Sequence, residues 1–121
     1  MNDQPPKIFG DGEQSRDFTY VSNVINANIL SATSSCDSGI SINCACHGYI
    51  TLNQLVDFIN EYLGKKIEPE YLPARAGDIK HSYADISLAK EKIDYYPDID
   101  FQTGLKLTIE SFAEKFEKQD I

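Results

Sequence analysis

The chain has 121 residues, a length that suits one domain with its own core. Its 41% of hydrophobic and 25% of charged residues are typical of a soluble globular protein. No apolar run approaches the roughly 18 residues of a membrane helix, and no signal-peptide segment is seen. The net charge of −8 disfavours nucleic-acid binding because a phosphate backbone would be repelled. We therefore expect one domain over residues 1–121, cytoplasmic, with no nucleic-acid or membrane partner.

The first part of the chain predicts short strands around one helix. Lys7–Gly10 is predicted as a strand, followed by the glycine-rich polar loop "GDGEQSRD" and a brief extended run at Phe18–Val21. Ser22 is predicted to cap a helix that ends near Thr33. Ile40–Cys44 is predicted as a strand. The side of the helix expected to pack on the core is Val24, Ile25, Asn28 and Ile29.

Thr51 and Gln54 have the spacing of a capping box, which predicts a helix start. The helix behind them is predicted to end at Gly64. Ile67–Leu72 is predicted as a strand interrupted by Pro69. The apolar stripe of the helix is Leu52, Leu55, Val56, Ile59 and Leu63.

Two more helices are predicted, one over Ser87–Ile93 and one that begins near Asp100. Strands and helices in this order predict an α/β (mixed α+β) layered domain. The last helix should pack through Leu105, Ile109, Phe112 and Phe116.

Cys44, Cys46 and His47, with the more distant Cys36, are the nearest approach to a metal-binding pattern. They lack the paired spacing of structural zinc sites. At the end of a strand, Cys44 and Cys46 would point the same way and would suit burial. An odd number of cysteines indicates reduced thiols. We therefore expect no metal site.

The chain lacks the usual catalytic signatures. It has no G-x-G-x-x-G dinucleotide fingerprint, no G-x-S-x-G, no Walker A and no H-E-x-x-H motif. Tyr62 and Lys66 have Tyr-x-x-x-Lys spacing, but they straddle the predicted helix end at Gly64. The chain alone is therefore not expected to contain catalytic residues or to bind a cofactor.

Arg16 and Arg75 lie in turn-rich segments, and their planar guanidinium groups suit the bidentate binding of a diphosphate. Asp78 could accept hydrogen bonds from vicinal hydroxyls, as an acidic residue does for a ribose. The alternative is that each arginine forms a surface ion pair, which contributes little to stability: Arg16 with Asp17 or Glu13, and Arg75 with Asp78.

Four segments, in this order, resemble those of nucleotide-sugar epimerases and dehydratases, which are extended short-chain dehydrogenase/reductase enzymes: "IFGDGEQSRDFTYVSNVINANILSA", "INCACHGYITLNQLVDFI", "RAGDIKHSYADISLAKEKIDYYP" and "FQTGLKLTIESF". The likeness covers Pro5 to Phe116 and is to the small C-terminal substrate domain of the UDP-glucose or UDP-N-acetylglucosamine 4-epimerase type. The N-terminal Rossmann domain, with its glycine fingerprint and Tyr-x-x-x-Lys, is absent. The resemblance thus implies a fragment of a longer enzyme.

The resemblance also implies a role for each matching residue. Arg16 in "SRDF" and Arg75 in "RAGD" are similar to the family's two diphosphate arginines, and Asp78 to the residue that binds the uridine ribose. The backbone of Lys7 and Phe9 resembles the segment that lines the uracil. Ser82, four residues after Asp78, matches the position that borders C2 of the sugar, where a small residue goes with acceptance of N-acetylated sugars. The segment "NCACHG" departs from the usual N-x-G-x-G by its two cysteines.

In the family, NAD takes a hydride from C4 of the sugar, and the 4-keto sugar rotates and is reduced on its other face. The resemblance implies that the longer enzyme binds NAD, that this chain binds only the UDP-sugar, and that the parent is a homodimer. Three alternatives remain open: the same domain of a 4,6-dehydratase, that of a UDP-glucuronate decarboxylase, or a non-catalytic interaction domain.

Overall fold

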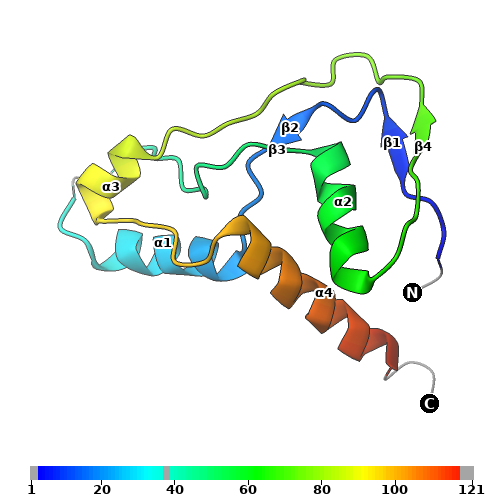
Figure 1. Cartoon of the computed structure of the whole chain (residues 1–121). Coiled ribbons are helices and arrows are strands. Elements are labelled where there is room, and N and C mark those ends of the chain that lie inside the picture. The colour runs from blue at the N-terminus through cyan, green and yellow to red at the C-terminus, as the bar shows by residue number, and fades with distance from the viewer. Residues whose placement is uncertain (1–2, 37–38, 118–121) are drawn as a thin grey trace.

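The computed structural model describes residues 3–36 and 39–117, and within these the chain forms four short strands and four helices (Figure 1). The strands form two small sheets. β1 (Lys7–Phe9) pairs in parallel with β4 (Glu70–Leu72), and β2 (Ser15–Arg16) pairs antiparallel with β3 (Ile50–Thr51). This mixed arrangement of strands and helices confirms the predicted fold class.

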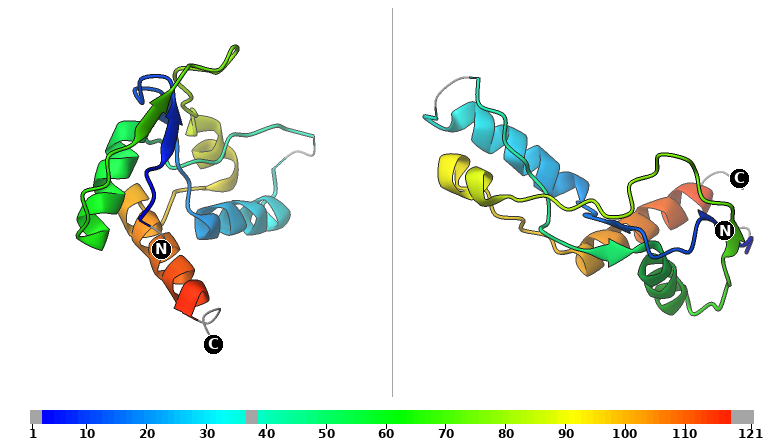
Figure 2. Two further views of the ribbon diagram at one scale, coloured as in Figure 1. Left: turned by 90° about the vertical axis from the view of Figure 1, so that its right-hand side faces the viewer. Right: turned by 90° about the horizontal axis from the view of Figure 1, so that it is seen from above.

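The helices divide between two ends of the molecule (Figure 2). At one end, α1 (Val21–Thr33) packs against α3 (Ser87–Ile93). At the other end, α2 (Leu52–Leu63) lies beside β1 and β4 (Figure 1), and α4 (Phe101–Glu117) packs against α2. No helix among residues 3–36 and 39–117 is long and apolar enough to cross a membrane.

The best-packed core joins α1 to α3. Ala27 and Ala89 let the two helices approach closely, and Ile93 and Tyr95 fill the space beside them. Tyr95 is fully buried, and its hydroxyl donates a hydrogen bond to the carbonyl of Ala45. Burial raises the pKa of Tyr95 to about 12, so this hydroxyl stays protonated and keeps its hydrogen bond at physiological pH.

The packed face of α1 is not the predicted one. Asn23 and Ala27 are the buried residues of the helix, and Asn23 Oδ1 accepts hydrogen bonds from the backbone amides of Asp98 and Ile99. The predicted face is exposed because no described element covers it: Val24, Ile25, Asn28 and Ile29. The predicted cap is also wrong, since the N-cap residue is Tyr20, two residues before Ser22, and its side chain makes no capping hydrogen bond.

Two predicted strands differ from the observed ones. Ile40–Cys44 forms no strand, because a strand requires a neighbouring ladder and no described strand lies beside it. Its Ile42 and Cys44 pack on the α1–α3 core instead. β4 covers only the last part of the predicted Ile67–Leu72, and its ladder with β1 begins at Glu70, whose amide donates to the carbonyl of Pro6.

The helix starts and ends that were predicted from local sequence patterns at Thr51, Gly64 and Asp100, in contrast, are confirmed. Thr51 and Gln54 form the capping box of α2, and Gly64 ends the helix with φ of 62°. Asp100 caps α4 by accepting a hydrogen bond from the amide of Thr103, which lowers the pKa of its carboxyl group. In α4, Ile109 is buried as predicted, but Phe112 is 52% exposed. The side chain of Phe116 lies outside the described residues.

Candidate nucleotide-sugar site

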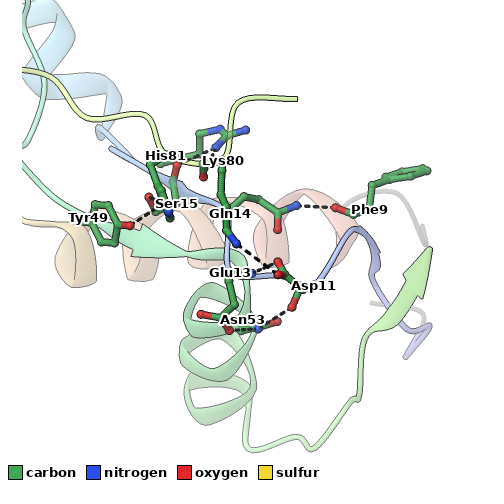
Figure 3. Close-up of polar contacts among 10 residues, drawn as sticks. Phe9, Asp11, Glu13, Gln14, Ser15, Tyr49, Asn53, Lys80 and His81 are labelled. Carbon is green, nitrogen blue, oxygen red and sulfur yellow. Dashed lines mark hydrogen bonds and ion pairs between the residues drawn. The ribbon is translucent and has the colours of Figure 1, made fainter. Parts of the chain in front are cut away.

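The glycine-rich loop after β1 is folded onto the start of α2 (Figure 3). The carbonyl groups of Gly12 and Gln14 accept hydrogen bonds from the amides of Asn53 and Leu52, at 3.1 and 3.2 Å. The Asn53 side chain donates in turn to the carbonyl of Asp11 and to the Glu13 carboxylate. The first amides of α2 are therefore occupied by the protein's own backbone.

Gly12 is required at this contact for two reasons. Its φ of 77° lies in the left-handed region that favours glycine. A Cβ atom placed on it would also meet Oδ1 of Asn53 at 1.9 Å, far inside van der Waals contact. The close approach of the loop to α2 thus depends on the absence of a side chain at position 12.

Gln14 and Ser15 turn the loop into β2. The buried Gln14 donates from Nε2 to the carbonyl of Phe9 at 2.6 Å, which ties the two ends of the loop together. Ser15 has no solvent exposure. Its amide donates to the carbonyl of Lys80 at 2.8 Å, and its carbonyl accepts from the amide of Ser82 at 3.1 Å. These two bonds bring residues 75–82 alongside β2.

Arg16 and Asp78 meet where these segments run together. The Arg16 Nη2 atom lies 2.9 Å from Oδ1 of Asp78, and its Nη1 atom donates to the carbonyls of Ser15 and Lys80, at 2.7 and 3.4 Å. The guanidinium is thus held by three acceptors from both segments. Both side chains remain partly exposed, at 31% and 40%, so a ligand can reach them.

Arg75 lies on the other side of the same region. Its guanidinium carbon is 3.6 Å from the centre of the Phe9 ring, a cation–π contact. Lys80 adds a third cation, 3.6 Å from the Asp11 carboxylate. A cleft of about 270 Å³ opens between the loop and the segment, lined by Phe9, Gly10, Asp11, Gln14, Ala74, Arg75, Asp78, Ile79 and Lys80.

The structure therefore brings most of the predicted site residues together. Phe9, Arg75 and Asp78 line the cleft, and Arg16 reaches it through Asp78. The alternative of local ion pairs is wrong in detail, because Arg16 pairs with Asp78, 62 residues away, and Arg75 lies on Phe9. Ser82 is exposed and next to the cleft along the chain.

Lys7 lies apart from the charged groups. Its side chain borders a second, apolar cavity of about 430 Å³ between β1 and α2. The backbone N–H and C=O groups of Lys7, however, point to the same edge of β1 as those of Phe9. The carbonyl of Pro6 and the amide of Gly10 bond to β4. Because backbone groups alternate along a strand, those of Lys7 and Phe9 point to the opposite edge of β1.

Several residues of the site carried no sequence signal. Gln14, Ser15, Asn53, Tyr49 and His81 all hold the loop or the 75–82 segment in place, yet each is an ordinary polar residue in its local sequence. Their partners are distant in the chain, so only the folded structure relates them. The capping box beside Asn53 was the one local pattern that placed the start of α2 here.

The residues weighed for metal or acid–base chemistry have structural partners. Asn23 donates to the Cys46 sulfur at 3.3 Å, and burial raises the pKa of Cys44. Within residues 3–36 and 39–117, no group of three His, Cys, Asp or Glu side chains could hold a metal ion. Tyr62 donates to Glu110 at 2.8 Å, which raises its pKa and disfavours a role as a base.

The sequence of the chain is similar to those of known nucleotide-sugar epimerases. The family model described as "NAD dependent epimerase/dehydratase family" matches residues 1–45. UDP-glucuronate 4-epimerase of Thermodesulfobacterium geofontis is 36% identical over 115 residues, which are 95% of this chain and 35% of the relative.

Solved structures show the same likeness. UDP-glucose 4-epimerase of Thermotoga maritima, crystallised with UDP-glucose, is 37% identical, with a TM-score of 0.88 over 94% of this chain and 36% of its own. UDP-N-acetylglucosamine 4-epimerase of Methanobrevibacter ruminantium M1, in complex with UDP-N-acetylmuramic acid, is 45% identical, with a TM-score of 0.87 over the same shares.

The chain therefore belongs to the NAD-dependent epimerase/dehydratase family of extended short-chain dehydrogenase/reductase enzymes. It spans about a third of the length of the relatives that it matches.

The contact between Gly12 and Asn53 gives a stability prediction. Gly12→Ala should destabilise the chain by about 1–2 kcal/mol through its positive φ, and by a further about 1–3 kcal/mol through the clash with Asn53. Gly77→Ala is the matched control, because Gly77 has a similar φ of 81° but open space around its Cβ position. Urea unfolding of both variants measures the difference. Equal losses of stability in the two variants would show that the contact with Asn53 adds no cost to that of the positive φ.

Proposed function

We propose that the chain is the substrate-binding portion of a longer nucleotide-sugar 4-epimerase and that its cleft binds the UDP of a UDP-hexose or UDP-N-acetylhexosamine. The observation that carries this proposal is the position of the chain's only two arginines in a protein with net charge −8. Arg75 lines the cleft with Asp78 and Phe9, and Arg16 is held beside the cleft by its ion pair with Asp78. Two guanidinium groups held close together in an acidic protein create a local positive field that suits an anionic ligand.

Arg16 is suited to one phosphate of the diphosphate. A guanidinium has five N–H donors. In the part of the chain that the structure describes, Nη1 and one donor of Nη2 are engaged, so Nε and the second donor of Nη2 remain for a ligand. The contacts to Ser15, Lys80 and Asp78 hold the group in place beforehand, which lowers the entropy cost of binding.

Arg75 and Asp78 complete the contact with the nucleotide. We assign Arg75 to the second phosphate, which it reaches from its place on the Phe9 ring. Asp78 uses Oδ1 for Arg16, and its Oδ2 is the atom assigned to a ribose hydroxyl. One carboxylate can accept both bonds because each of its oxygens has two lone pairs.

The outer edge of β1 is assigned to the uracil ring. Backbone groups of Lys7 and Phe9 point to this edge, and the edge of uracil offers donor and acceptor groups much like those of a peptide. The Phe9 carbonyl already accepts from Gln14 at 2.6 Å, and its second lone pair stays available. The Phe9 ring adds an apolar surface beside the base.

The rest of the longer enzyme is the proposed partner of the chain's apolar faces. On α1, Val21, Val24, Ile25 and Ile29 are each between 43% and 59% exposed, and none of the apolar residues of α2 is buried. Monomeric proteins rarely leave such stripes uncovered. A Rossmann domain docked on these faces would account for them.

The residues present do not fit NAD. The chain has no glycine fingerprint, and the first amides of α2 are bonded to Gly12 and Gln14 instead of being open to a pyrophosphate. We therefore assign the cofactor to the remainder of the enzyme. This chain supplies binding energy away from the reacting carbon, which orients the hexose.

The isolated chain is expected to neither bind NAD nor turn over a UDP-hexose. Purified chain mixed with NAD and UDP-galactose should yield no UDP-glucose above a buffer blank. The reason is that the dinucleotide site and the catalytic base lie elsewhere. Turnover by the pure chain would contradict the proposal that the dinucleotide site and the catalytic base belong to the rest of the enzyme.

Arg16→Ala or Arg75→Ala in the longer enzyme should weaken UDP binding by about 1.5–3 kcal/mol, the scale of hydrogen bonds to charged groups. Lysine at either position should recover only part of the loss, because an ammonium cannot form the bidentate contact. Titration calorimetry with UDP measures both effects. Lys106→Ala, which removes an exposed cation of α4, is the control for net charge. Parental affinity in both arginine variants would refute the assignment.

Ser82 should determine which sugar is accepted. His81 and Tyr83 both reach residues 47–49, so an extended backbone is expected to direct Ser82 away from them. Ser82→Tyr should fill the space of an acetamido group and lower kcat/KM for UDP-N-acetylglucosamine tenfold or more, about 1.4 kcal/mol. UDP-glucose should be much less affected, and Ser82→Ala should preserve both activities. Equal losses on the two substrates would remove Ser82 from the sugar site.

A further inference from the structure

A cluster of polar side chains lies outside the residues assigned to the nucleotide. The Tyr49 hydroxyl is 2.6 Å from Nδ1 of His81, and the Ser15 hydroxyl is 3.0 Å from the same nitrogen (Figure 3). The Tyr49 and His81 rings also contact each other, with centroids 5.4 Å apart. Close by, the Tyr83 hydroxyl lies 2.6 Å from Nδ1 of His47.

The cluster joins a regular part of the fold to an irregular one. Ser15 is fully buried in β2, and Tyr49 directly precedes β3, the antiparallel partner of β2. His81 belongs to residues 73–83, which are all exposed and contain no helix or strand beyond a single bridge at His81. The His81 ring therefore attaches this exposed segment to the β2–β3 sheet, in addition to the ion pair of Arg16 with Asp78.

The attachment lies next to the groups that hold Arg16. The residues on either side of His81 make the two backbone bonds to Ser15, and the carbonyl of Lys80 also accepts from Arg16. Asp78, the ion-pair partner of Arg16, is three residues before His81. A movement of the segment at His81 would therefore displace Asp78 and the carbonyl of Lys80 together.

We propose that His81, through Nδ1 and its contacts with Ser15 and Tyr49, is a positioning residue that fixes the Arg75–Ser82 segment against β2. The ligand-binding role of that segment rests on the proposed function. His81 need not touch the nucleotide. Its effect is to keep Arg75 and Asp78 in the register in which they line the cleft, with Ser82 next to them along the chain. When the ring proton is on Nε2, Nδ1 has one lone pair, which accepts from one of the two hydroxyls while the other remains in contact.

Three substitutions separate the Nδ1 contact from the bulk of the ring. Asparagine places its amide near the position of Nδ1, glutamine places it near Nε2, and alanine removes both. We expect His81→Asn to keep the amide exchange rates of Ser15 and Ser82 in the ligand-free chain within about threefold of the parent. His81→Gln and His81→Ala should raise both rates by about tenfold or more. A side chain that only fills space would not distinguish asparagine from glutamine.

Two tyrosine variants supply a matched comparison. Tyr49→Phe and Tyr62→Phe each remove one exposed tyrosine hydroxyl, but Tyr62 bonds to Glu110 between α2 and α4, away from the cluster. Tyr49→Phe should accelerate exchange of the Ser82 amide by about threefold to tenfold. Tyr62→Phe should leave it unchanged. Similar exchange in the two variants would overturn the proposal.

UDP titration of the same histidine variants, made in the longer enzyme, gives the second readout. His81→Asn should bind UDP within about threefold of the unsubstituted enzyme, and His81→Ala should bind about tenfold more weakly. Failure of the unsubstituted longer enzyme to bind UDP would refute the proposed function alone, because the exchange experiment is done without ligand. Parental exchange rates in His81→Ala, or equal rates in His81→Asn and His81→Gln, would overturn the positioning role.

Discussion

The two backbone hydrogen bonds of Ser15 are the interaction on which the rest of the site depends. They connect β2 to residues 80 and 82, across more than half of the chain. The Arg16–Asp78 ion pair cannot serve this purpose alone, because both groups are partly exposed and such pairs contribute about 0–1 kcal/mol. Once the backbones are joined, however, the same pair costs little to form and sets the direction of the guanidinium.

The elements that could be predicted from the sequence are those whose causes are local. The capping box at Thr51 and Gln54 and the glycine stop at Gly64 lie within one helix, and α2 has the predicted bounds. The packed face of α1 could not be predicted in this way. Its valines and isoleucines have the spacing of a core stripe, but the face that packs within the described chain carries Asn23 and Ala27. The predicted strand at 40–44 differs for a related reason, since a strand depends on its neighbour.

The candidate site shows the same difference between features with local causes and features that depend on distant partners. The side-chain chemistry of Arg16, Arg75 and Asp78 indicated a nucleotide ligand, and the family resemblance assigned a role to each of these positions. Composition and spacing gave no reason to pair Arg16 with Asp78, because local partners were available in Asp17 and Glu13. The side chains of Ser15, Tyr49, Asn53 and His81 were missed altogether. Each acts through a partner at least 32 residues away, so no sequence window contains both members of a contact.

The contact between Gly12 and Asn53 also bears on how this protein can change during evolution. Any side chain at position 12 would collide with the Asn53 amide, which itself donates to the loop and accepts from the Tyr71 hydroxyl. A substitution at position 12 would therefore require the Asn53 side chain to shift or to become smaller, and either change would break its hydrogen bonds to the loop and to the Tyr71 hydroxyl of β4. Each of the two positions therefore restricts the residues that the other can accept. Among relatives, glycine at 12 and asparagine at 53 should therefore be inherited together.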